Sequence, residues 1–261
     1  MLAYDMLADA FDEYIKIGES TTIESLKRFC RAIVEVFAEQ YLRSPNANEV
    51  ARLLHVGKER GFPGMLGSLN CMHWKWKNCP TAWAGQYDSR SGTPTIILEA
   101  VADYDIWIWH AHFGLSGSNN DINVLEASYL FANLASGIAL PAHYVIKGNE
   151  YNMSYYLADD FYPKWSALVQ TIHDPHDVER AFEVLQSRFA IVAGPSHFWN
   201  KHVLHDIMIA CIIMHNMIIE DERNIKATIN DWMQAPIPTV DMRADENTRF
   251  QEFIARHKKN Q

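Results

Sequence analysis

The stretch from Gly67 to Trp76 constrains the fold of this chain more than any other. It follows a glycine- and proline-rich lead-in, and within it Leu69 and Cys71 alternate with Asn70 and Met72. This period of two predicts a strand with side chains on both faces. A carboxylate in the middle of such a strand would suit a metal site, but this chain carries the amide of Asn70.

A second pattern predicts a hairpin. Thr95 to Asp103 and Ile106 to Gly114 are both strand-like, and Tyr104-Asp105 separates them as a turn. Alternation places His110 and His112 on one face of the second strand. A His-x-His pair on a strand can chelate a metal; partly buried strand histidines are the commoner outcome, and both interpretations stay open.

Helices are expected on either side of these strands. Residues 1–60 show helical spacing, with a first helix from Met6 to Ile17 and a capping box at Thr21–Glu24 opening the second. The two helices could form a helix-turn-helix that reads DNA or a lid packed on the following domain. The second helix has no clear basic face, which favours the lid.

The second half of the chain continues the alternation of strands and helices. Strands are predicted at His143–Ile146 and at Tyr155–Asp159, a helix begins at Asp177, and a long helix spans residues 196–222 with Ser196 as its cap. Residues 223–261 lose the periodicity and are predicted to be a frayed helix or a disordered tail. The whole pattern predicts an α/β fold.

Charge, cysteines and hydropathy narrow the class of protein. The formal net charge is −9, whereas a dedicated nucleic-acid binder usually has a basic excess. The four cysteines form no CxxC pair, and the start of the chain lacks the features of a signal peptide, so reduced intracellular thiols are expected. No apolar run is judged long enough to span a bilayer, and no membrane is expected.

Several blocks of the sequence resemble one family. Gly61–Trp83 contains GSLNCMHW, which is similar to the first catalytic block of plant Harbinger-type transposases and their domesticated nuclease relatives. The resemblance continues through four further blocks: Asn119–Leu125, Tyr155–Asp159, Val178–Phe182 and Ile218–Arg223. It implies a ribonuclease-H-like DDE nuclease core over residues 61–222, an N-terminal helical region over 1–60 with a remnant helix-turn-helix as one interpretation, and a tail over 223–261.

The resemblance also implies a site. The family's three catalytic carboxylates fall at Asn70, Asp159 and Glu179, and Asp121 is expected to line the site as a further metal-binding residue. In the family these groups hold two divalent ions, Mg²⁺ or Mn²⁺. Without the resemblance, Asp121 would be interpreted as a helix cap and Glu179 as an ordinary helix carboxylate. The histidines of the long helix (His202, His205 and His215) are expected to be satisfied core or surface residues.

Two departures from the family pattern decide the functional hypothesis: Asn70 replaces an Asp, and the Asp159–Glu179 spacer is shorter than in the family. Asp160 also replaces a Gly, which would strain a turn that needs a positive φ. The chain is therefore predicted to be a transposase-derived, DNA endonuclease-like protein whose catalysis is impaired.

Two alternatives stay open. One is an active metal-dependent nuclease in which Asp121 or Asp103 substitutes for the lost carboxylate, and the other is a non-catalytic protein- or DNA-binding scaffold. The resemblance further implies weak DNA binding, or DNA binding assisted by a Myb-like partner protein, and a nuclear location. The sequence indicates no oligomeric state.

Overall fold

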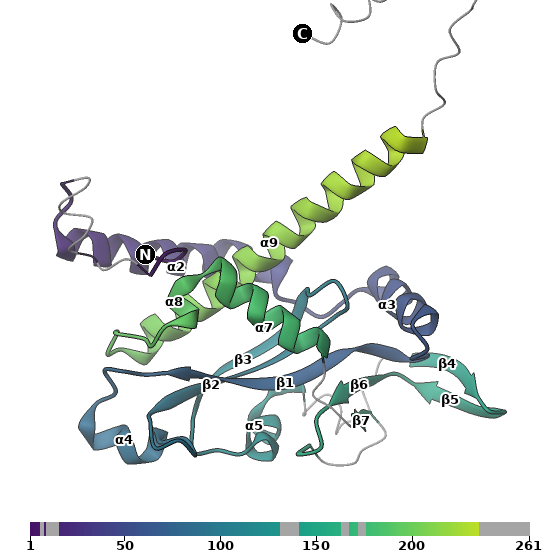
Figure 1. Ribbon diagram of the computed structural model, residues 1–261, viewed down its shortest axis with the longest axis horizontal. Coiled ribbons are helices and arrows are strands. Elements are labelled where there is room, and N and C mark those ends of the chain that lie inside the picture. Colours follow the sequence, from purple (N-terminus) through teal and green to yellow (C-terminus); the bar gives the residue numbers. More distant parts are fainter. Residues whose placement is uncertain (6–7, 9–15, 131–140, 163–166, 172–175, 235–261) are drawn as a thin grey trace, which may run out of the picture. The chain divides into compact units, whose positions relative to one another are not determined.

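The computed structural model describes residues 1–5, 8, 16–130, 141–162, 167–171 and 176–234, with side chains as far as Ile225 (Figure 1). The chain divides into two compact units, Met1–Asp221 and Glu222–Gln261. The sheet, the site and the cores discussed below all belong to the first unit. The predicted boundaries at residues 60 and 222 stay a prediction.

A mixed five-stranded sheet forms the centre of the first unit. Its strands lie in the order β3-β2-β1-β6-β7, with β1 in the middle. They span Met65–Lys75 (β1), Thr95–Ala102 (β2), Ile108–Ser116 (β3), Tyr155–Ala158 (β6) and Leu168–Gln170 (β7). The β1–β2 and β2–β3 pairs are antiparallel, whereas the β1–β6 and β6–β7 pairs are parallel. The predicted strand and hairpin are therefore confirmed, within two residues at each end.

The helices and a separate hairpin complete the fold. The helices are α2 (Glu19–Tyr41), α3 (Ala47–Glu59), α4 (Thr81–Tyr87), α5 (Asp121–Ala127), α7 (His176–Arg188), α8 (Ala190–Ala193) and α9 (Lys201–Gln234). β4 (Pro141–Ile146) and β5 (Asn149–Met153) form a two-stranded antiparallel sheet of their own. The mixture of helices and sheet confirms the α/β class.

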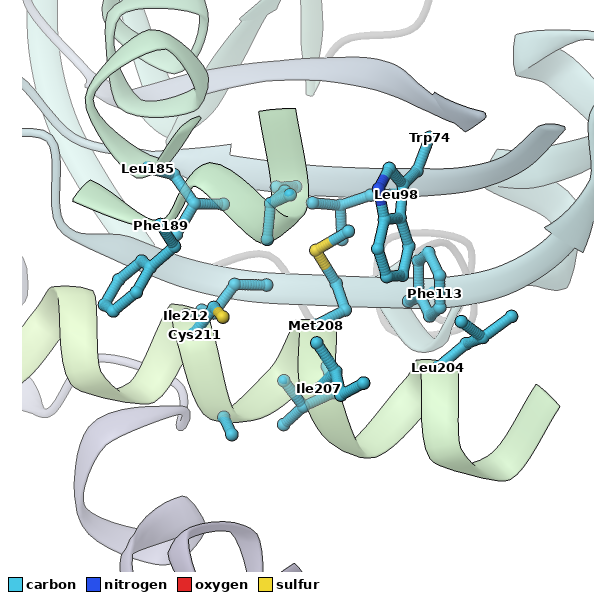
Figure 2. Packing of buried hydrophobic residues seen from close by; sticks show 14 of the residues in the cluster. Trp74, Leu98, Phe113, Leu185, Phe189, Leu204, Ile207, Met208, Cys211 and Ile212 are labelled. Atoms are coloured by element: carbon cyan, nitrogen blue, oxygen red, sulfur yellow. The ribbon is translucent and has the colours of Figure 1, made fainter. Parts of the chain in front are cut away.

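One face of the sheet carries the large hydrophobic core. Alternation sends Trp74 of β1 and Leu98 of β2 to this face, where they pack with buried residues of α7 and α9 such as Leu185 and Met208. Figure 2 shows these side chains interlocking between the helices and the strands. Burying each aliphatic side chain of this kind contributes about 1.5–3 kcal/mol, so this layer fixes α7 against β1.

A smaller core fills the opposite face. Leu69 and Val101 point to this side and pack with Leu125 of α5 and Ala158 of β6. Consecutive residues of β1 therefore point into different cores. Polar side chains of β1 can contact one another or a covering helix only when they lie on the same face of the sheet.

The glycine-rich lead-in to β1 has a clear structural reason. Gly64 has a φ of +90°, a conformation that side chains rarely adopt, and the ring of Tyr144 in β4 occupies the place of a Cβ atom. The carbonyl of Gly64 also accepts the N–H of Tyr155 at 3.0 Å. This glycine lets the separate hairpin and β6 approach the start of β1.

Several predicted helix ends were wrong. The capping box was expected at Thr21–Glu24, but α2 begins at Glu19 after Gly18 with no side-chain cap. The capping box lies instead at Asn46 and Glu49, at the start of α3. Ser196 caps no helix, because its backbone pairs with Trp76 and the long helix starts only at Lys201. That helix also continues past residue 222 to Gln234.

Other expectations need smaller corrections. The strand predicted to reach Asp159 ends at Ala158, and β5 and β7 were not predicted. Asp160, which stands where the family has Gly, does not adopt a positive φ, so the exchange causes no strain of that kind. The helix expected at Met6–Ile17 lies mostly outside the described residues. The tail beyond Gln234 lies outside them entirely.

The expectation that no apolar run is long enough to span a bilayer was also wrong. Within the described residues, the Lys201–Ile225 segment of α9 is long and apolar enough to cross a membrane by length and composition. Core helices of globular proteins pass the same test, and most of this segment is buried in the protein. Its residues Leu204, Ile207 and Ile212 are fully buried in the large core.

The second N-terminal helix packs into the same core. Leu26 and Cys30 of α2 are buried among the residues of the large hydrophobic cluster, and Arg31 forms a 2.9 Å ion pair with Asp206 of α9. This arrangement is the lid-like packing expected of α2. Cys30 is buried enough that desolvation raises its pKa to about 12.

Candidate functional site

Asn70 and Asp159 lie at the point where β6 ends beside β1. The last pair of the parallel ladder is Leu69 with Ala158, so the next residues along the two strands are Asn70 and Asp159. Asp159 is only 8% exposed, and its Oδ1 accepts the N–H of Phe161 at 3.0 Å as the chain turns away. The two predicted site residues therefore lie at the same level of the sheet, Asn70 within β1 and Asp159 just past the end of β6.

Asn70 lies on the face of β1 that α7 covers. Ser68 accepts the backbone N–H of Val178 at 3.0 Å, and the sulfur of Met72 accepts Gln186 Nε2 at 3.1 Å. Asn70 falls between these two residues with the same strand parity, and it is half-buried. Its own Oδ1 accepts the N–H of Cys71 at 2.7 Å.

Glu179 lies in the first turn of α7, half-buried beside this face. Asp177 pairs with Arg60 at 2.9 Å, and Arg60 in turn stacks over Tyr104, in the turn between β2 and β3. Residues two apart on a helix are separated by about 200°. Glu179 is therefore on the flank of α7 opposite Asp177, away from Tyr104 and the turn between β2 and β3.

Asp121 lies on the other face of the sheet. It occupies the first turn of α5, after Asn120, whose side chain caps the helix by accepting the N–H of Asn123 at 2.9 Å. Burial raises the pKa of the Cys71 thiol, and the neighbouring Asp121 carboxylate adds to the shift. Cys71 has the opposite parity to Asn70. The structure thus brings together Asn70, Asp159 and the helix of Glu179, and it places Asp121 apart from them.

Asp103, the second carboxylate considered as a substitute, already has a structural role. It is 1% exposed, its Oδ2 accepts hydrogen bonds from Arg52 and from Trp109 Nε1, and its Oδ1 accepts the N–H of Trp107. These bonds brace the turn between β2 and β3. Asp103 therefore serves the hairpin and does not face Asn70.

The His-x-His pair of β3 faces a buried carboxylate that sequence reasoning missed. His110 Nε2 lies 3.2 Å from Oε2 of Glu99, a residue of β2 with no exposed surface. His112 is paired in register with Glu99, and desolvation lowers its pKa. A single glutamate in an apolar strand was the available signal, because such a residue needs a partner.

A second missed contact lies beside the site. The hydroxyl of Tyr162 is 3.2 Å from Sγ of Cys71, and burial raises the pKa of Tyr162 well above its ordinary value. This contact closes the loop after Asp159 against β1. No pattern in the sequence marked Tyr162, because its role depends on where β6 stops.

The oxygen ligands at the candidate site suit a hard divalent cation, but the site has fewer carboxylates than a two-metal centre needs. Two carboxylates and one amide oxygen are the oxygen ligands that Mg²⁺ and Mn²⁺ accept. The third anionic ligand of a two-metal site is absent at Asn70. Across the part of the chain that the structure describes, no three His, Cys, Asp or Glu side chains form a group that could hold a metal. The described residues therefore do not make up a complete two-metal site.

His215, in α9, is a satisfied core histidine, as expected. It has no exposed surface, and its Nε2 lies 2.8 Å from the carbonyl oxygen of Ile106. His202 and His205 of the same helix are exposed. None of the three takes part in the site.

Comparison with known proteins gives one match. A family model described as plant transposon protein matches residues 39–226, which is more than half of the chain. The match spans β1, the turn after β6 and the first turn of α7. No curated protein and no solved structure matches the chain.

Proposed function

The chain belongs to the plant transposon protein family, and from this premise we propose that it is a transposase-derived, endonuclease-like protein with impaired catalysis. The observation that carries the proposal is the position of Asn70 beside Asp159, at the end of the β1–β6 ladder. In this proposal Asp159 and Glu179 are the remaining metal-binding carboxylates. Asn70 occupies the place of the missing one.

The sheet supports a ribonuclease-H-like DDE core for this protein. Its antiparallel half, β3-β2-β1, is followed by a parallel half, β1-β6-β7, and α7 packs across β1. In this proposal the mid-strand residue Asn70, the strand-end residue Asp159 and the helix residue Glu179 form the site.

Charge is the reason for proposing impairment. A carboxylate between two Mg²⁺ or Mn²⁺ ions can bridge them with negative charge, whereas an amide offers one neutral oxygen. Losing that charge weakens metal binding and the stabilisation of the transition state by several kcal/mol. A deficit of about 4 kcal/mol corresponds to roughly a thousandfold in rate.

The positions of Asp121 and Asp103, the two carboxylates that could substitute for the one missing at Asn70, do not favour an active enzyme. Asp121 is on the opposite face of the sheet, near Cys71, and Asp103 is engaged by Arg52 and two tryptophans of the hairpin. Either would need to leave its present partners to reach Asn70. We therefore rank this alternative below the impaired enzyme.

DNA is the proposed substrate class, bound weakly or with a Myb-like partner protein in the nucleus. A non-catalytic protein- or DNA-binding scaffold is the second candidate, and the net charge of −9 favours it, because an acidic surface suits a basic partner. Salt-dependent DNA affinity separates DNA binding from a purely protein-binding role.

The test is nicking of supercoiled plasmid with Mg²⁺ or Mn²⁺ by the unmodified protein and by Asn70→Asp. Asn48→Asp, which adds a carboxylate on the exposed first turn of α3, is the matched control. We expect activity only in Asn70→Asp, and its loss when Asp159→Asn is added.

The other outcomes are equally informative. Activity of the unmodified protein would overturn the proposed impairment. Silence of both proteins, when both are folded, would mean that restoring one charge does not assemble a nuclease site, and the scaffold would then become the leading function.

A further inference from the structure

A second polar site lies on the face of the sheet opposite α7. A cavity of about 650 Å³ opens between the C-terminal half of β1, the 88–94 loop and the loop before α5. Its wall is rich in hydroxyl and amide groups, including Ser91, Thr93 and Asn119. The size is that of a pocket for one or two nucleotides rather than a packing defect.

The 88–94 loop is internally ordered. Ser91 Oγ lies 2.8 Å from Ser89 Oγ and 2.9 Å from Thr93 Oγ1, and Ser89 and Thr93 also pair through their backbones at 3.0 Å. These bonds hold the loop that carries Arg90 at the rim of the cavity. The binding surface is therefore preformed, which lowers the entropic cost of binding.

Two permanent cations border the cavity without acid partners. Lys75 and Arg90 are both exposed, and neither forms an ion pair with any residue that the structure describes. Arg90 instead lies 5.7 Å from the ring centroid of Phe161. An unpaired guanidinium beside an aromatic ring is a pairing that recognises a phosphate and a neighbouring base.

Phe161 connects this cavity to the candidate site. Phe161 is 57% exposed, and its backbone N–H donates to Asp159 Oδ1. The ring is thus two residues from the carboxylate at the end of β6. Phe161 thus joins Asp159, two residues away, to Arg90, which lies beside its ring.

We propose that this cavity, on the other face of the sheet from Asn70, binds the phosphodiester backbone of DNA that passes the end of β6 at Asp159, with an unpaired base stacked on Phe161. Lys75 and Arg90 contact the phosphates, and the loop hydroxyls and Asn119 donate to phosphate or base oxygens. The proposal rests on DNA as the substrate class of the proposed function. It extends that function by naming the surface and by favouring a single strand over a duplex.

Two carboxylates line the same cavity and limit its affinity. Asp88 and Asp121 offset the formal charges of Lys75 and Arg90. Binding is therefore expected to be weak and steep in its salt dependence. Removing Asp88 should strengthen binding, whereas removing a cation should weaken it.

The experiment measures affinity for fluorescent single-stranded and duplex oligonucleotides by anisotropy across a range of salt concentrations, without added metal. The Lys75→Gln/Arg90→Gln double variant should bind single strands about tenfold more weakly, and the slope of log affinity against log salt should fall by about 1.4. Phe161→Leu should cost about tenfold for single strands and little for duplex. Asp88→Asn should tighten binding several-fold.

Lys58→Gln removes one cation from the exposed surface of α3, outside the cavity; it is the control and should change affinity less than twofold. If the double variant matches this control while the unmodified protein binds DNA, the cavity proposal is wrong and DNA binding itself stands. If duplex binds more tightly and Phe161→Leu has no effect, the single-strand proposal is wrong. If the unmodified protein binds neither oligonucleotide, both proposals are wrong: DNA binding at the cavity and DNA as the substrate class.

Discussion

The backbone N–H of Val178 donates a 3.0 Å hydrogen bond to the hydroxyl of Ser68, and both residues are buried. The first N–H groups of a helix have no partner within the helix, so this bond satisfies one of them for α7. It also fixes the start of α7 on β1. Asn70 lies two residues beyond Ser68, and Glu179 directly follows Val178, so one hydrogen bond sets the relative position of both.

Replacing Ser68 should therefore loosen the site as well as the fold. Ser68→Ala leaves the Val178 N–H buried without a partner, which should lower the free energy of unfolding by about 1–3 kcal/mol. Urea unfolding measures this cost. Ser44→Ala, at an exposed serine between α2 and α3, should change stability by less than about 0.5 kcal/mol. An equal, small effect of both changes would show that Ser68 does not hold α7.

The central strand and its hairpin could be predicted from the sequence because their signals are local. The period of two in β1 and the turn at Tyr104-Asp105 both depend on neighbouring residues. The same periodicity assigned His110 and His112 to one face correctly. Only the fold could show that this face also holds Glu99, because the two strands meet through pairing rather than through sequence.

The end of β6 could not be predicted in the same way. The register that sets Asp159 beside Asn70 comes from long-range parallel pairing of β6 with β1. The face on which Asp121 lies depends on strand parity in a similar way, because Asn70 and its neighbour Cys71 point to opposite faces of β1. The capping box at Asn46–Glu49 has the same spacing as the Thr21–Glu24 pattern, and the fold shows which of the two patterns caps a helix.

Restoring the carboxylate at position 70 should make stability depend on metal. Asn70→Asp places a second carboxylate opposite the mostly buried Asp159, so the variant should be less stable than the unmodified protein in the presence of a chelator. Mn²⁺ should reverse this loss. At a concentration about 100-fold above its dissociation constant, a ligand that binds only the folded state adds about 2.7 kcal/mol.

Thermal unfolding with EDTA or Mn²⁺ tests this prediction independently of activity. The unmodified protein and Asn48→Asp should show the same melting temperature in both conditions to within about 1 °C. A Mn²⁺ shift of equal size in all three proteins would mean that the metal binds elsewhere. Absence of any shift in Asn70→Asp would contradict the proposed metal-binding role of Asp159 and Glu179.

Glu49 should make α3 sensitive to acid. Arg43 donates two 2.8 Å hydrogen bonds to its carboxylate, and these hold the pKa of Glu49 below its ordinary value of 4.5. A lowered pKa contributes stability that is complete above about pH 4.5 and is lost as pH falls through the folded-state value. The difference in unfolding free energy between the unmodified protein and Glu49→Gln should be about 1 kcal/mol at pH 6 and shrink below pH 4.5.

Urea unfolding from pH 3 to pH 7 provides the measurement for Glu49. Glu39→Gln, on the exposed surface of α2, is the control and should give a difference near zero at every pH. A Glu49→Gln difference that stays constant down to pH 3 would show that the Arg43 pair is not linked to protonation of Glu49.

The buried Glu99 and the half-buried His110 should stabilise the protein as a pair. Glu99 has no exposed surface, its Oε2 contacts His110, and no partner for Oε1 exists among the described residues. His110→Ala should therefore lower the free energy of unfolding by about 3–5 kcal/mol, because it leaves the buried carboxylate of Glu99 without this partner. Replacing both residues by leucine should cost much less, since an apolar pair removes the burial penalty of both polar groups.

A double-mutant cycle with Glu99→Leu, His110→Leu and the double variant measures the coupling by urea unfolding. We expect the double variant to be more stable than the His110→Leu single variant. His55→Ala, at an exposed histidine of α3, should cost less than about 0.5 kcal/mol. Additive single effects would refute the pairing and would assign Glu99 a partner other than His110. A coupling of about 1 kcal/mol or more would establish that the face opposite α7 depends on this pair, and that β3 is held to β2 by more than its backbone ladder.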